Sequence, residues 1–148
     1  MVAELKKKYS GRVSFSLRHF PLDFHKEADE SAIAIECVRD QGPIEAFHRF
    51  LFQNQRAQKV PDLKRYARQA RLPDPARFDR CLDARRYQKR VERDMQAGNA
   101  IGVTGTPAVL IGRVDHKKDK ITGVLLIGAR GRSSYEEALE RFLKEKGK

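Results

Sequence analysis

A chain of 148 residues has the length of one ordinary domain and can bury a core without a disulfide or a metal. Two cysteines are too few for a disulfide-dense scaffold or a four-cysteine zinc site. No apolar run approaches the roughly 18 residues that a membrane-spanning helix needs, so no membrane span is expected.

The formal net charge of +11 is concentrated in one stretch. Residues 59–93 hold twelve basic and five acidic residues, a net charge of +7. Two interpretations remain open. The favoured one is a solvated helical face, because arginine and lysine stems cover apolar surface while their charged ends stay in water. The alternative is a binding surface for an acidic partner such as nucleic acid or anionic lipid.

The first predicted elements are a short helix and a strand. Apolar residues at helical spacing predict a helix over 2–9, and Gly11 is suited to the left-handed turn that ends it. Residues 12–18 alternate strictly between polar and apolar, which predicts a strand with one buried face. Pro21 cannot donate to a sheet and should lie beyond the end of that strand.

A block of five helices is predicted next. Their expected bounds, from apolar periodicity and from the prolines and glycines between them, are 26–41, 44–54, 61–71, 76–82 and 84–101.

Beyond residue 102 the pattern becomes that of a strand pair followed by a helix. The apolar runs 108–111 and 121–127 predict two strands joined by the charged connection 116–120. Ser133 is expected to cap the last helix, with Glu136 completing a capping box. The fold class is therefore α/β, and 1–148 is expected to be a single domain with a helical insertion over about 43–101.

The residue types that carry chemistry give few local signals. The four histidines show no metal-ligand spacing, so neither a metal nor a cofactor is expected, and surface or capping roles are expected for His19 and His25. Phosphate-loop and nucleophile-elbow motifs are also absent. Cys37 and Cys81 lie 44 positions apart in predicted helices. Two buried thiols are the favoured interpretation, and a structural disulfide is the alternative.

Over nearly its whole length the chain resembles the DsbA-like branch of the thioredoxin superfamily, a family of thiol:disulfide oxidoreductases. The resemblance rests on residues 13–22, His25-Lys26-Glu27-Ala28, Glu36-Cys37, residues 46–52, Phe78 with Cys81-Leu82, residues 102–107 and Gly128-Ala129. It implies a thioredoxin-like fold and protein or peptide thiols as substrates. It also implies that Pro107 is cis and that Gly105, Thr106 and Pro107 bind an extended substrate segment.

The family's catalytic Cys-x-x-Cys does not occur in this chain. Residues 1–9 are similar to the end of the helix that follows this motif, so the first strand and the motif would precede Met1. Two explanations are open: an internal methionine taken as the start, which is favoured, or a true truncation that has lost redox chemistry. The favoured one predicts upstream sequence that encodes an apolar strand, Cys-x-x-Cys and a helix running into Val2.

The predicted function is that of a DsbA-like protein that keeps its peptide-binding edge but has no catalytic residues in this chain. The rival is a non-redox binding module that uses residues 59–93 on an acidic partner, with nucleic acid the less favoured choice. No signal peptide is recognisable after Lys6, Lys7 and Lys8. As written, the chain would stay in the cytoplasm, whereas an upstream start would allow a periplasmic or exported protein.

Overall fold

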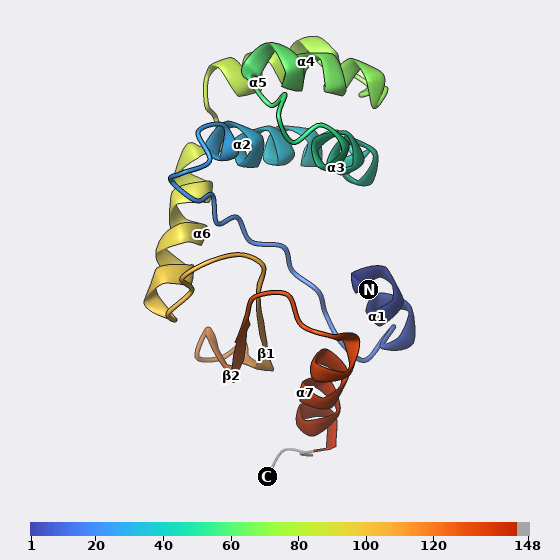
Figure 1. The fold of residues 1–148 in the computed structure, drawn as a ribbon, viewed down its shortest axis with the longest axis vertical. Helices are drawn as coiled ribbons and strands as arrows, with labels where there is room; N and C mark the ends of the chain where they lie inside the picture. Colours follow the sequence, from blue (N-terminus) through green and yellow to red (C-terminus); the bar gives the residue numbers. More distant parts are fainter. Residues whose placement is uncertain (145–148) are drawn as a thin grey trace. The chain divides into compact units, whose positions relative to one another are not determined.

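The structure, a computed structural model, describes residues 1–144 and contains seven helices and one two-stranded sheet in that range. In chain order these are α1 (Val2–Lys8), α2 (Ala28–Arg39), α3 (Ile44–Gln53), α4 (Val60–Gln69), α5 (Pro75–Asp83), α6 (Gln88–Ala100), β1 (Ala108–Asp115), β2 (Lys120–Ile127) and α7 (Arg132–Lys144) (Figure 1). The α/β class is confirmed. The last four residues of the expected domain, 145–148, lie outside the described residues.

Contacts divide the chain into two compact units. The hairpin unit contains residues 1–17 and the chain from Asn99 onward, and the helical unit contains residues 18–98. Each has its own apolar core, which in the helical unit includes Ile33, Phe47 and Phe78 and in the hairpin unit Tyr9, Ile111 and Tyr135.

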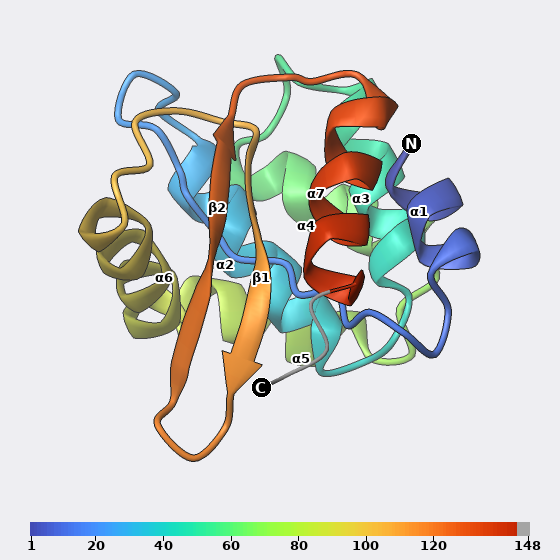
Figure 2. The same cartoon turned by 90° about the horizontal axis from the view of Figure 1, so that it is seen from below.

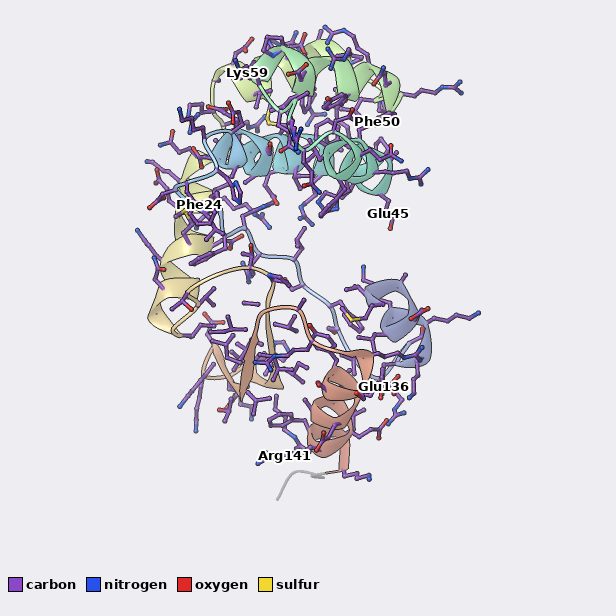
Figure 3. The ribbon with its side chains drawn as sticks, in the orientation of Figure 1. Phe24, Glu45, Phe50, Lys59, Glu136 and Arg141 are labelled. Carbon is purple, nitrogen blue, oxygen red and sulfur yellow. A yellow bond between two sulfur atoms is a disulfide. The ribbon has the colours of Figure 1, made fainter. Side chains whose placement is uncertain are left out.

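Helix α2 is the buried centre of the helical unit. Every residue from Ser31 to Val38 is buried, and α3, α4 and α5 all contact this helix. Figure 1 shows α4 and α5 as one layer over α2 and α3. Aromatic rings pack between these layers: the ring centroids are 5.7 Å apart for Phe47 and Phe78, and 5.9 Å apart for the stacked pair Phe50 and Tyr66. Phe50 is labelled in Figure 3.

A disulfide between Cys37 and Cys81 joins α2 to α5, with the two Cα atoms 5.9 Å apart (Figure 3). The expectation of two free core thiols is therefore wrong. Both side chains do lie in the core, at 1% and 8% exposure. Burial and helical periodicity could be predicted from the sequence, whereas the pairing depends on how α5 packs against α2.

In the hairpin unit, β1 and β2 pair antiparallel from Ala108↔Ile127 to Asp115↔Lys120 (Figure 2). Gly112 and Gly123 face each other, and a Cβ on either would collide with the backbone of the other strand. Helix α7 packs along β1 through Tyr135 and Leu139.

An ion-pair network joins α1 to α7 within the hairpin unit. The Glu136 carboxylate lies 2.6 Å from Arg132 Nε and 3.1 Å from Lys8 Nζ (Figure 3). Hydrogen bonds from Arg132 and Lys8 lower the pKa of Glu136. Because α7 begins at Arg132, Ser133 lies inside its first turn and is not the cap that the sequence predicted. Glu136 pairs with cations and does not complete a capping box.

The predicted strand over 12–18 is not formed. Residue 12 lies in a turn, residues 13–18 have no regular secondary structure, and among residues 1–144 the backbone of 14–18 makes no hydrogen bond. Phe15 and Leu17 are 40% and 48% exposed, so their predicted burial is also wrong. Alternation identifies an extended backbone, but a strand also needs a neighbouring strand to bond with.

The disulfide closes a loop across a sequence separation of 44 residues. The loop-closure relation gives about 4 kcal/mol of stabilisation for a loop of this length. Replacing both Cys37 and Cys81 by serine is therefore expected to lower the free energy of unfolding by up to about that amount. Urea unfolding followed by circular dichroism measures the change. An unchanged unfolding midpoint would show that the crosslink does not constrain the unfolded chain.

Candidate functional site

Gly105, Thr106 and Pro107 form the bend that leads directly into β1. The Thr106–Pro107 peptide bond is cis, the geometry that the family resemblance implies for this proline. The Pro107 carbonyl accepts a hydrogen bond of 2.8 Å from the Gly128 N–H just beyond β2. Gly128 has a φ of +81°, which glycine adopts without steric cost and which positions its N–H beside the start of β1.

Thr106 itself presents an unused pair of backbone groups. Thr106 and Pro107 are exposed, and neither the N–H nor the C=O of Thr106 bonds to any described residue. The sheet within residues 1–144 has only two strands, so β1 has an unpaired edge. An unpaired strand edge is a template for another extended chain.

The helical unit contains a buried polar cluster that the sequence analysis did not find. Glu36 is 2% exposed, and its Oε1 lies 2.7 Å from Nε2 of His19, which is 8% exposed. Arg39 donates from Nε and Nη2 to the same carboxylate, and Arg90 Nε lies 2.9 Å from Oε2 as an ion pair. The negative charge of Glu36 is thus surrounded by donors, as burial of a carboxylate requires.

Asp94 provides the second buried carboxylate of the helical unit. It accepts the backbone N–H of His19 at 3.1 Å and Arg18 Nη1 at 3.0 Å. Residues 18 and 19 are therefore fastened to α6 by Asp94 and to α2 by Glu36. The expectation that His19 has a surface or capping role is wrong. The quoted resemblance included both His19 and Glu36, but nothing in their spacing of 17 residues indicates a contact.

The cysteines and the metal-ligating side chains of residues 1–144 form neither a Cys-x-x-Cys pair nor a metal cluster. Both cysteines of the chain are in the disulfide, and neither belongs to a Cys-x-x-Cys. Within residues 1–144 no three histidine, cysteine, aspartate or glutamate side chains come together as a metal site. No helix in the described range is long and apolar enough to cross a membrane.

A family model described as thioredoxin matches residues 1–124. Together with the α/β fold, this match places the chain in the thioredoxin family.

Curated relatives carry the name of a sodium/proton antiporter. The chain is 36% identical over 117 residues to Na(+)/H(+) antiporter NhaA 3 of Salinispora tropica. The aligned segment covers 78% of this chain and 18% of the relative. It is 34% identical over 106 residues to NhaA 1 of Salinispora arenicola, and the aligned segment covers 70% of this chain and 16% of that relative. It is 28% identical over 142 residues to NhaA of Nitrosospira multiformis, and the aligned segment covers 94% of this chain and 23% of that relative. The chain thus spans less than a quarter of each relative.

Removing the buried carboxylate at position 36 tests the cluster. Glu36→Ala leaves His19 and Arg39 without their shared acceptor and Arg90 without its ion-pair partner, and breaking a buried pair in this way costs about 3–5 kcal/mol of unfolding free energy. The matched control is Glu45→Ala on α3, an exposed glutamate, for which a change within about 0.5 kcal/mol is expected (Figure 3). Equal effects in urea unfolding would contradict the role given to Glu36.

His48 is expected to make the stability of the helical unit depend on pH. Burial, followed by the nearby charges of His19 and Arg39, lowers the pKa of His48 below its ordinary value of 6.5. The unfolded chain then binds a proton more readily than the folded chain, so the contribution of His48 is fully present above pH 6.5 and is lost as the pH falls through the folded pKa.

NMR titration of the His48 imidazole is expected to give a pKa below 6.5, and His48→Gln is expected to reduce the loss of stability on acidification in that range. An imidazole that titrates at or above 6.5 would contradict the proposed effect of burial.

Proposed function

We propose that this chain is a DsbA-like thioredoxin domain that binds extended polypeptide segments at Gly105, Thr106 and Pro107. The observation that carries the proposal is the exposed Thr106, whose backbone N–H and C=O bond to no described residue. A peptide that lies beside Thr106 as an added strand would use both groups. The proposal treats 1–148 as one domain in which residues 43–101 are a helical insertion.

Substrates of this kind fit the family, since thioredoxin-like proteins act on protein and peptide thiols. The expected specificity is low, because main-chain hydrogen bonds supply affinity without reading the side chains of the peptide. The neighbouring Pro107 carbonyl already accepts a hydrogen bond from the Gly128 N–H. This bond holds the bend against the hairpin whether or not a peptide is bound.

Within this chain we propose binding without disulfide exchange. Exchange needs a thiolate that attacks a disulfide sulfur. Cys37 and Cys81 are bonded to each other inside the core, with Cys37 at 1% exposure, and neither lies at a helix N-terminus where a reactive thiolate is stabilised. The chain therefore holds a substrate segment but offers no nucleophile for it.

The alternative of a nucleic-acid surface over residues 59–93 has less support along α4, although Arg80 and Arg86 of the same stretch have no ion-pair partner in residues 1–144. The cations of α4 are already paired: Lys64 with Asp83, Arg65 with Asp62 and Arg68 with Asp79. These pairs fit a solvated helical face. Binding to nucleic acid that weakens steeply as the salt concentration rises would favour the alternative.

The similarity to antiporters does not imply that this chain transports ions. The matched segments account for 16% to 23% of those relatives, so what they share with this chain is a minor part of each polypeptide.

The peptide-binding edge is tested with Thr106→Pro, which removes the N–H that an added strand would accept from. Thr104→Pro, two residues away in the same exposed loop, is the matched control. The probe is a ten-residue peptide of alternating valine and serine with a glutamate at each end. We expect Thr106→Pro to weaken its binding about two- to tenfold, the value of one backbone hydrogen bond, and Thr104→Pro to leave it unchanged. Equal affinities for all three proteins by isothermal calorimetry would contradict the proposal.

The absence of exchange is tested separately by insulin reduction in the presence of dithiothreitol. We expect the chain and its Cys37→Ser/Cys81→Ser variant to give the same rate as buffer. Turnover by the chain that disappears in the variant would show that the buried pair is a redox centre after all.

A further inference from the structure

An open hollow in the helical unit is lined by three arginines. The residues that line it are Arg77, Arg80, Cys81, Ala84 and Arg86, and its volume is about 540 Å³. The three arginines and Ala84 are exposed, whereas Cys81 is 8% exposed. We call this feature the arginine hollow.

The hollow is built by one helical face and the turn that follows it. Residues 77, 80, 81 and 84 lie at helical spacings of three and four along α5 and its end, so they share one face. At the end of α5, Arg85 adopts a left-handed φ of +46°. The N–H of Arg86 bonds to the Cys81 carbonyl at 3.1 Å, and that of Arg85 to the Leu82 carbonyl at 2.9 Å. This Schellman turn brings the backbone of Arg86 back beside Cys81.

Two contacts with α2 hold this turn in place. The Arg85 side chain pairs with Asp29 and Glu30 in the first turn of α2, which helps to offset the cost of a left-handed arginine. The disulfide fixes Cys81, which lines the hollow, to Cys37. The arginine hollow is thus positioned before any ligand arrives.

The carboxylates of α5 and its cap are engaged elsewhere. Asp74 caps α5 by accepting the Arg77 N–H, Asp79 pairs with Arg68, and Asp83 pairs with Lys64. None of the three is available to neutralise the guanidinium groups of the hollow.

The three guanidinium groups are consequently short of acceptors. Within residues 1–144 neither Arg80 nor Arg86 has a side-chain hydrogen bond or ion pair, and the Arg86 guanidinium lies 5.8 Å from the centroid of the Tyr87 ring. Arg77 has one long ion pair, 3.7 Å to Asp40. Three weakly compensated positive charges around one concavity attract an anion more strongly than separate charges do.

We propose that the arginine hollow binds small oxyanions that carry two or more negative charges, in the form of phosphate or carboxylate groups. The planar guanidinium donates two parallel hydrogen bonds to either group, and such pairs are among the strongest hydrogen bonds in proteins. The volume is in the range of small-molecule sites. This site lies in the helical unit and is independent of the edge at Thr106, which belongs to the hairpin unit.

The test compares two double variants that remove the same charge. Arg80→Ala/Arg86→Ala removes the two cations of the hollow that have no ion-pair partner. Lys89→Ala/Arg93→Ala, the control, removes two exposed cations of α6 that do not line the hollow. The probes are pyrophosphate and citrate, with acetate as a singly charged control, at 150 mM NaCl. Affinity is measured by calorimetry, and the site is located by the NMR shifts of the Cys81 and Ala84 amides.

We expect pyrophosphate or citrate to bind and acetate not to bind, with the shifts centred on Cys81 and Ala84. Arg80→Ala/Arg86→Ala should weaken binding at least tenfold, and the α6 variant less than twofold. Preference for pyrophosphate over citrate would identify phosphate as the ligand chemistry, and the reverse preference would identify carboxylate. Equal losses in the two variants, or no binding by the unaltered chain at millimolar concentration, would overturn the proposal.

Discussion

The burial of helix α2 on all sides is the constraint on which the helical unit depends. Eight consecutive residues of this helix are buried, so every polar side chain among them needs a partner inside the protein. Ser31 donates to Gln58 at 2.8 Å, and Glu36 accepts from His19 and Arg39. A buried helix that lacked these partners would carry unpaired polar groups at a cost of about 1–3 kcal/mol each.

The partners of α2 also determine where the neighbouring segments lie. The disulfide at Cys37 fixes α5, Glu36 holds residues 18–19 through His19, and Arg90 brings α6 to the same carboxylate. The strained turn at Arg85 is likewise paired with the first turn of α2. The positions of the exposed arginines beyond that turn therefore follow from the packing of a single helix. The hairpin unit works differently, because its candidate site is made of backbone groups at a strand end.

The elements that the sequence could predict are those determined by local spacing. The five helices of the block and the hairpin all appear within a few residues of their predicted bounds, because apolar periodicity and proline breaks act over one or two turns. Apart from the Ser133 cap, the failures involve partners far away in the sequence. The segment 12–18 alternates like a strand, but no described strand pairs with it. His19 is buried in contact with Glu36, 17 residues away, and Cys37 forms a disulfide with Cys81, 44 residues away. The resemblance identified Thr106 and Pro107, whereas periodicity marked them only as a loop.

The proposed peptide edge requires a Thr106 backbone that is open to an incoming chain while the neighbouring Pro107 carbonyl is bonded within the fold. Amide hydrogen exchange measures both groups in one experiment. The Gly128 N–H, which is bonded to the Pro107 carbonyl, should exchange slowly with or without peptide, whereas the Thr106 N–H should exchange quickly alone and slowly once the valine–serine peptide is added. A Thr106 amide that exchanges at the same fast rate when the peptide is bound would contradict the account.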